Sequence, residues 1–156
     1  MDYYDHVSYQ EAYDDLLKRL LATLATVETD ESVLQFSTQA ADSIRAAAKE
    51  VPEFYIGEFL QMFASAVVQR MQAETAAGEQ TVKDAKMEAA IASVELNARF
   101  AAADAAGDRA AQHAIWGDRE KVQAANQAKV DAVSARMDVL ALQLKAFTTI
   151  QSTLAN

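Results

Sequence analysis

The chain has 156 residues, of which 51% are apolar and 24% are charged, and its formal net charge is −9. It contains 34 alanines, 4 glycines, 1 proline and no cysteine. A composition this rich in alanine and this poor in turn residues indicates an all-α fold. It excludes a collagen, a disulfide scaffold and an ordinary β-sandwich.

The acidic side chains are concentrated in the first half of the chain. Residues 1–78 hold 13 acidic and 5 basic side chains, whereas residues 79–156 hold 10 acidic and 9 basic ones. An acidic N-terminal half repels phosphate backbones and anionic lipids. We therefore expect neither a nucleic acid nor a membrane surface as a partner.

The sequence carries no sign of a targeting or membrane-spanning segment. Its first residues lack a basic segment followed by an apolar one, and the longest apolar stretch covers only residues 20–27. A bilayer span needs about 20 apolar residues. We expect no signal peptide, no transmembrane segment, and a location in the cytoplasm, or in a virion if the resemblance described below holds.

Two helices are predicted before the only proline. Over residues 9–27, apolar residues recur at steps of three and four, which is the pattern of a helix with one buried face. The second helix, over residues 30–51, follows Thr29, a favourable N-cap residue. Pro52 ends this helix, because it lacks the amide proton that a helix interior needs.

A third helix is predicted over residues 52–77, with Pro52 in its first turn and Gly78 at its C-terminal cap. Its apolar stripe is the strongest in the chain, so we expect it at the centre of the core. Residues 1–78 are thus expected to form an N-terminal three-helix unit. The stripe comprises Tyr55, Ile56, Phe59, Leu60, Phe63, Ala66, Val67 and Met71.

The second half, residues 79–156, is expected to be a long helical arm or a helical hairpin. Apolar residues alternate at steps of four and three, which is typical of a coiled-coil seam. One alternative makes residues 81–153 a single helix; the other, which we favour, breaks the helix near Gly117 rather than at Gly107. The seam comprises Met87, Ile91, Val94, Ala98, Ala101 and Ala105, and then Val130, Val133, Met137, Leu140, Leu144 and Phe147.

No pattern in the sequence indicates an enzyme. Neither histidine belongs to a Glu-x-x-His pair of the kind that holds two irons in helical bundles. There is no Gly-x-Ser-x-Gly motif and no glycine-rich phosphate loop. We predict no catalytic, cofactor-binding or metal-binding residue and no small-molecule substrate.

The candidate partner-binding residues are aromatic and apolar. Tyr3 and Tyr4 lie among acidic residues, and they either cover the end of the bundle or anchor a partner with a basic surface. Trp116, the only tryptophan, either packs at the end of a hairpin or inserts into another subunit. The C-terminal seam is either an interface or an internal core; its candidates are Val133, Met137, Leu140, Leu144 and Phe147.

Residues 101–114 and 122–129 are rich in alanine and glutamine. In composition and apolar periodicity, residues 80–156 resemble small helical virion proteins of tailed bacteriophages, which include internal, tail and head–tail proteins. The resemblance implies a non-enzymatic part held by copies of itself or by neighbouring virion proteins. We therefore expect a structural or assembly protein that acts through helix packing in a homo-oligomer. The alternative is a helical adaptor or chaperone-like module with an acidic, tyrosine-rich docking surface.

Overall fold

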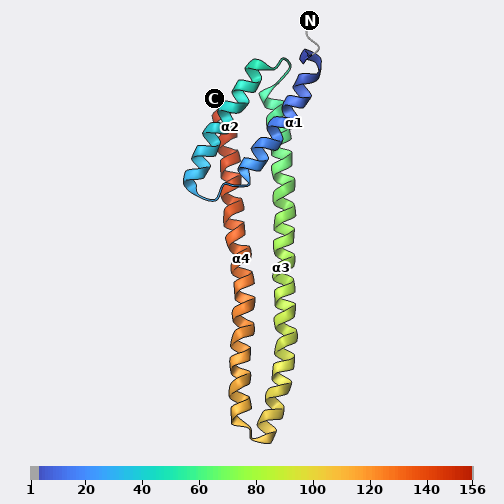
Figure 1. Cartoon of the computed structure of the whole chain (residues 1–156), viewed down its shortest axis with the longest axis vertical. Helices are drawn as coiled ribbons and strands as arrows, with labels where there is room; N and C mark the ends of the chain where they lie inside the picture. The colour runs from blue at the N-terminus through green and yellow to red at the C-terminus, as the bar shows by residue number, and fades with distance from the viewer. Residues whose placement is uncertain (1–3, 156) are drawn as a thin grey trace. The chain divides into compact units, whose positions relative to one another are not determined.

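The computed structural model describes residues 4–155, and their side chains from Tyr9 onward. They form four α-helices, so the expected all-α class is confirmed for this part of the chain. The helices divide between two compact units, which we call the bundle (Met1–Ala73 and Met137–Asn156) and the hairpin (Glu74–Arg136). In chain order the helices are α1 (Tyr4–Leu24), α2 (Asp30–Glu50), α3 (Ile56–Ala106) and α4 (Arg109–Ala155) (Figure 1).

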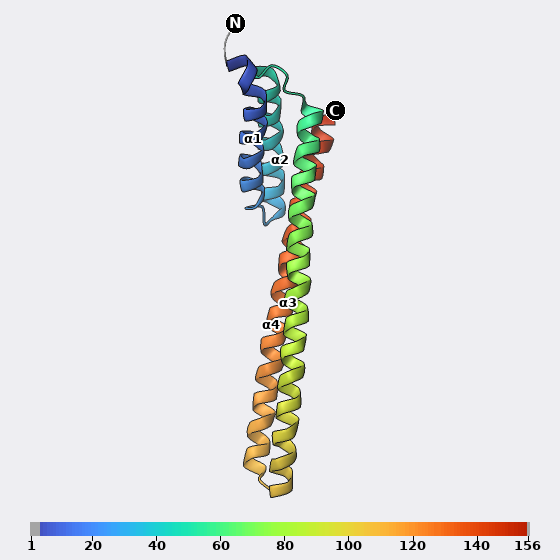
Figure 2. The ribbon, with the colours of Figure 1, turned by 90° about the vertical axis from the view of Figure 1, so that its right-hand side faces the viewer.

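The bundle packs four helical segments around one core, rather than the three expected from the sequence. α1 and α2 run side by side in opposite directions (Figure 2), and the beginning of α3 and the end of α4 complete the unit. Phe59 and Phe63 on α3 are fully buried. The ring of Phe147 on α4 lies 5.0 Å from that of Phe63, centroid to centroid. The fourth segment belongs to the unit because its aromatic and aliphatic residues fill this core.

The connection between α2 and α3 differs from the expected one. α3 begins at Ile56 rather than at Pro52. Phe54 is buried in the core of the bundle, and Glu53 before it has a positive φ of 63°. Residues that turn in this way and bury a ring cannot also form the first turn of a helix. The hydroxyl of Tyr13 accepts a hydrogen bond from the N–H of Tyr55 at 2.9 Å.

Buried polar side chains join α4 to the rest of the bundle. The Gln143 side chain is almost fully buried, and its Nε2 donates a hydrogen bond to the carbonyl of Val27 at 3.3 Å. Ser37 Oγ lies 2.6 Å from the carbonyl oxygen of Val33 and 3.2 Å from that of Ala146. These contacts fix α4 against α2 and the α1–α2 loop, because a buried amide or hydroxyl is costly without a partner.

The break in the second half lies at Gly107 and Asp108, and not near Gly117. Gly107 has a φ of 64°, and the N–H groups of Gly107 and Asp108 donate to the carbonyls of Asp104 and Ala103. This is the Schellman arrangement that ends a helix at a glycine. The side chain of Asp108 then caps α4 by accepting the N–H of Ala111 at 3.0 Å.

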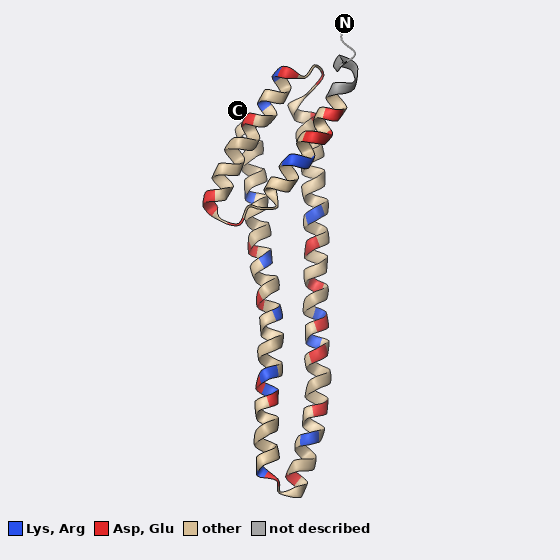
Figure 3. Ribbon diagram, viewed as in Figure 1, with Lys and Arg blue, Asp and Glu red and all other residues tan. Residues whose placement is uncertain are grey.

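The hairpin pairs the two helices that meet at this turn, and they run antiparallel (Figures 1 and 2). The alternative of one helix over residues 81–153 is therefore wrong, and the expected helix end at Gly78 lies inside α3. Leu96, Ala103 and Ile115 form a small buried cluster. Acidic and basic side chains are interspersed along both arms (Figure 3). Ion pairs join Arg99 to Asp118, Lys129 to Glu88, and Arg136 to Glu74.

Candidate functional site

Two of the predicted partner-binding residues fall at the N-terminus. Tyr3 lies outside the described residues. Tyr4 is the first residue of α1, but its side chain is not among those described. The hypothesis that this pair anchors a partner therefore stays a prediction.

The C-terminal part of the predicted seam lies mostly inside the bundle. Leu140 and Phe147 are buried among residues of their own chain, as the internal-core alternative for this part of the seam expects. Leu144 keeps 46% of its surface exposed. Met137 is half-buried, as is Val133 in the hairpin. Of these five residues, only Leu144 has a side chain exposed enough to contact another molecule.

Trp116 is partly packed and partly exposed on α4. Its ring and that of Phe100 on α3 are nearly perpendicular, at 6.4 Å between centroids, and the Arg119 guanidinium lies 5.1 Å from the Trp116 ring centroid. The side chain still exposes 53% of its surface. Trp116 thus contacts Phe100 within the hairpin and leaves about half of its surface in solvent.

The largest difference from the sequence prediction concerns the seam on α3. All six of its residues are exposed, and the largest of them, Met87, Ile91 and Val94, expose 65%, 64% and 71% of their surface. The face of α3 that packs against α4 instead contains Ala85 and Leu96, both buried. In the hairpin, α3 is therefore apolar on two faces. We call the exposed series the outer stripe: Met87, Ile91, Val94, Ala98, Ala101 and Ala105.

The seam between α3 and α4 is thinly packed in the middle of the hairpin. An open pocket of about 210 Å³ lies there, lined by four alanines together with Glu88, Val122, Asn126 and Lys129. Among the described residues, the Oδ1 of Asn126 is a buried side-chain atom without a hydrogen-bond partner. A seam built from small residues with an unpaired amide oxygen stabilises a helix pair only weakly.

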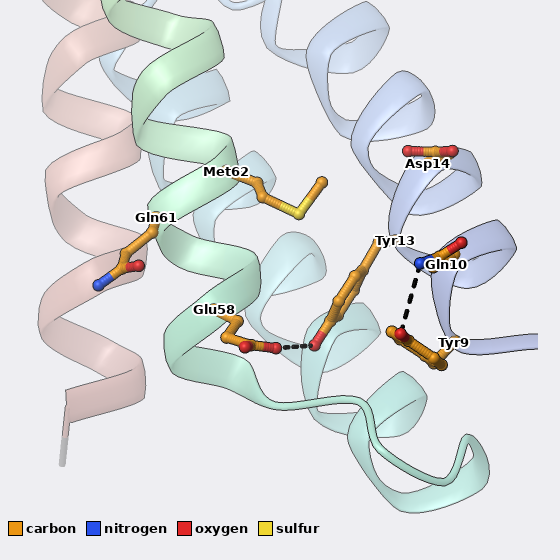
Figure 4. A pocket seen from close by; sticks show the side chains of 7 residues that line it. All are labelled: Tyr9, Gln10, Tyr13, Asp14, Glu58, Gln61 and Met62. Carbon is orange, nitrogen blue, oxygen red and sulfur yellow. Dashed lines mark hydrogen bonds between the residues drawn. The ribbon is translucent and has the colours of Figure 1, made fainter.

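A second candidate surface lies between α1 and the start of α3 in the bundle (Figure 4). It is an open groove of about 460 Å³, and the rings of Tyr9 and Tyr13 meet there edge to face at 5.9 Å between centroids. The carboxylates of Asp14 and Glu58 are exposed beside them. We call this surface the tyrosine groove; it is lined by Tyr9, Gln10, Tyr13, Asp14, Glu58, Gln61 and Met62.

The hydroxyl of Tyr13 fixes one wall of the tyrosine groove. It donates a hydrogen bond to Glu58 Oε2 at 3.0 Å while it accepts the N–H of Tyr55. Burial raises the pKa of Tyr13, the Tyr55 N–H lowers it, and the nearby Glu58 carboxylate raises it. The net direction is upward, so Tyr13 stays protonated and holds Glu58 beside the rings. Aromatic faces next to carboxylates suit a cationic group.

Comparison with known proteins gives no match: no protein family, no curated protein and no solved structure is similar to this chain. Among the described residues, no group of three or more His, Asp or Glu side chains could hold a metal ion. No helix in the same part of the chain is long and apolar enough to cross a membrane. The outer stripe and the tyrosine groove are the two features on which a function can be proposed.

Proposed function

We propose that the protein is a non-enzymatic structural or assembly protein that acts through helix packing in a homo-oligomer. The observation that carries this proposal is the outer stripe. A helix with one face packed against a neighbour ordinarily carries polar residues on the opposite face. Here the opposite face carries apolar residues at alternating steps of four and three, the pattern by which helices pair.

The weakness of the hairpin's own seam supports the same proposal. Its buried cluster contains Leu96, Ala103 and Ile115, with Phe100, Ala111 and Val122 packed against it, whereas three side chains of comparable size lie exposed on the outer stripe. Fully burying a side chain such as Met87, Ile91 or Val94 stabilises a structure by about 1.5–3 kcal/mol. A helix docked on the outer stripe would therefore add apolar burial that a single chain does not provide.

The amino-acid composition of residues 80–156 supports a more specific role. Its alanine- and glutamine-rich composition resembles that of small helical virion proteins of tailed bacteriophages. We propose a tail, head–tail or internal protein of such a virion, with further copies of the chain or neighbouring virion proteins as its partners.

Sedimentation velocity over a range of concentrations tests the assembly proposal. The expected result is a particle mass of at least twice the 17.0 kDa of one chain. The double variant Ile91→Lys, Val94→Lys should dissociate the oligomer without loss of helix content, because both side chains are exposed within one chain and lysine is a good helix former.

A matched control separates the outer stripe from apolar exposure in general. Leu34 on α2 exposes 67% of its surface and lies in the bundle. Leu34→Lys makes the same kind of change outside the outer stripe and should leave the mass unchanged. A 17.0 kDa monomer at high concentration, with no partner added, would contradict the proposed assembly.

The tyrosine groove favours a second candidate function, that of a helical adaptor. Its rings and its Asp14 and Glu58 carboxylates suit a lysine or arginine side chain of a partner. Isothermal titration with a lysine-rich helical peptide tests this role. Glu58→Gln should weaken binding about two- to fivefold, the range of an exposed ion pair. Glu28→Gln, which removes a carboxylate outside the tyrosine groove, should have no effect. Equal binding by both variants would remove the reason to hold this candidate.

A further inference from the structure

We infer that the outer stripe binds the outer stripe of a second copy of the chain, with the two α3 helices antiparallel. This inference rests on the proposed self-assembly and names the surface and the orientation through which it occurs. The contact is isologous, because the same residues of both copies take part.

The sizes of the side chains favour the antiparallel orientation. The outer stripe has bulky residues in its first half and alanines in its second. In a parallel pair, Met87 would face Met87 and Ala101 would face Ala101, so no single helix separation would suit both ends. In an antiparallel pair, Met87 lies opposite Ala98 of the second copy and Ile91 opposite Val94. Each layer then has a similar volume, which allows close packing along the whole contact.

The charges beside the outer stripe favour the same orientation. Asp84 continues the series toward the N-terminus, and a parallel pair would place two copies of this carboxylate against each other. In the antiparallel pair, Asp84 lies opposite Ala101 of the second copy. Lys83 and Asp104 flank the same side of the outer stripe, and Lys83 of each copy then lies opposite Asp104 of the other. The symmetry gives two such pairs of opposite charge.

The other flank carries Glu88 and Glu95, which would approach each other across the antiparallel pair. Glu88 already forms an ion pair with Lys129 of its own chain, at 2.7 Å between Nζ and Oε2. This partner offsets the repulsion on that side. The whole contact, from Gln80 opposite Ala105 to its symmetric equivalent, uses residues of the hairpin alone.

Disulfide trapping tests the orientation, and the absence of natural cysteine removes any background. Two single variants are made, Met87→Cys and Ala98→Cys, and are oxidised separately and as a mixture. The antiparallel pair predicts a disulfide between the two variants in the mixture. It predicts no disulfide within either variant alone, because the equivalent residues lie about 16 Å apart along the axis and a disulfide cannot bridge that distance.

A charge reversal tests the flanking pairs in the protein without cysteine. Lys83→Glu alone or Asp104→Lys alone should raise the dissociation constant about tenfold at low salt, since each change places like charges together at two positions. The variant with both changes should restore the original value. Lys86→Glu makes the same charge change off the flank and serves as one control. Gln112→Ala is the other, since Asp104 also accepts a hydrogen bond from Gln112 within its own chain at 3.0 Å.

The outcomes separate this inference from the assembly proposal. A disulfide in the mixture only, together with rescue by the double reversal, supports the antiparallel contact. An oligomer in which each cysteine variant links to itself, or in which neither forms a link, overturns the inference and leaves self-assembly standing. A monomer at all concentrations overturns both.

Discussion

At the scale of single residues, Tyr13 couples the tyrosine groove to the stability of the bundle. The side chain is buried and hydrogen-bonded to Glu58, and burial raises its pKa above the ordinary value of 10.0. In the unfolded chain the phenol ionises first as the pH rises. The contribution of Tyr13 to stability is therefore complete below pH 10 and is lost as the pH rises through the folded pKa.

Urea unfolding of the protein and of Tyr13→Phe, at neutral pH and above pH 10, measures this effect. At neutral pH the variant should lose about 1 kcal/mol, because the Tyr55 N–H no longer has its hydroxyl partner. Above pH 10 the difference should shrink, since phenylalanine does not ionise. A difference in unfolding free energy that stays constant with pH would show that folding does not raise the pKa of Tyr13.

The two fully buried phenylalanines of α3 determine most of the bundle's aromatic packing. The ring of Phe59 contacts those of Tyr13, Phe54 and Phe63. Phe59→Ala or Phe63→Ala should lower the free energy of unfolding by about 3–5 kcal/mol, because each leaves a cavity in a close-packed core. Leu34→Ala, at an exposed site, should change it by less than about 0.5 kcal/mol. Thermal unfolding that is unaffected by either phenylalanine change would place the core elsewhere.

At the scale of helices, Gly107 and Gly117 should respond in opposite ways to substitution by alanine. Gly107 has a φ of 64°, and a side chain there strains the backbone by about 1–2 kcal/mol. Gly117 lies inside α4, with no atom within 4 Å of where a Cβ would be. Gly117→Ala should therefore stabilise the protein by up to about 1 kcal/mol, and Gly107→Ala should destabilise it. Denaturant midpoints measure both changes, and the reverse order would move the turn to Gly117.

The same two glycines explain why the sequence predicts the turn near Gly117 when it lies at Gly107. Gly107 and Gly117 are both followed by aspartate, so the local signals for a helix end are equal. The packing of the two hairpin helices determines which glycine forms the turn, because a turn at Gly107 brings Leu96 against Ile115 in one cluster. By contrast, the start of α2 could be predicted well, since the Thr29 cap is a local signal.

For a related reason, the sequence predicts that the outer stripe is the buried face of α3, whereas another face packs against α4. Met87 and Ile91 are large apolar residues among charged residues and alanines, so the periodicity selects the outer stripe as the seam. The face that is buried against α4 includes Ala85 and Ala103, and alanine contrasts little with the many other alanines of the chain. The tyrosine groove also depends on contacts between distant segments, since it needs α1 beside α3. Periodicity within one helix carries no such information.

At the scale of the whole molecule, the two units differ in what stabilises them. The bundle has an extended core of aromatic and aliphatic side chains, whereas the hairpin has a small cluster and ion pairs that are partly exposed. Exposed ion pairs contribute little, typically less than about 1 kcal/mol each. The hairpin should therefore open more readily than the bundle when a chain is alone.

Hydrogen exchange at low and high protein concentration measures this difference. At low concentration the amides around Leu96 should exchange faster than those around Phe63, and assembly should slow the exchange around Leu96 alone, because only the hairpin gains a partner. In the Ile91→Lys, Val94→Lys variant, concentration should no longer affect exchange, while the protection around Phe63 should remain. Equal protection of both units at every concentration would mean that the hairpin is stable without a partner, and the exposed apolar residues on α3 would then need another explanation.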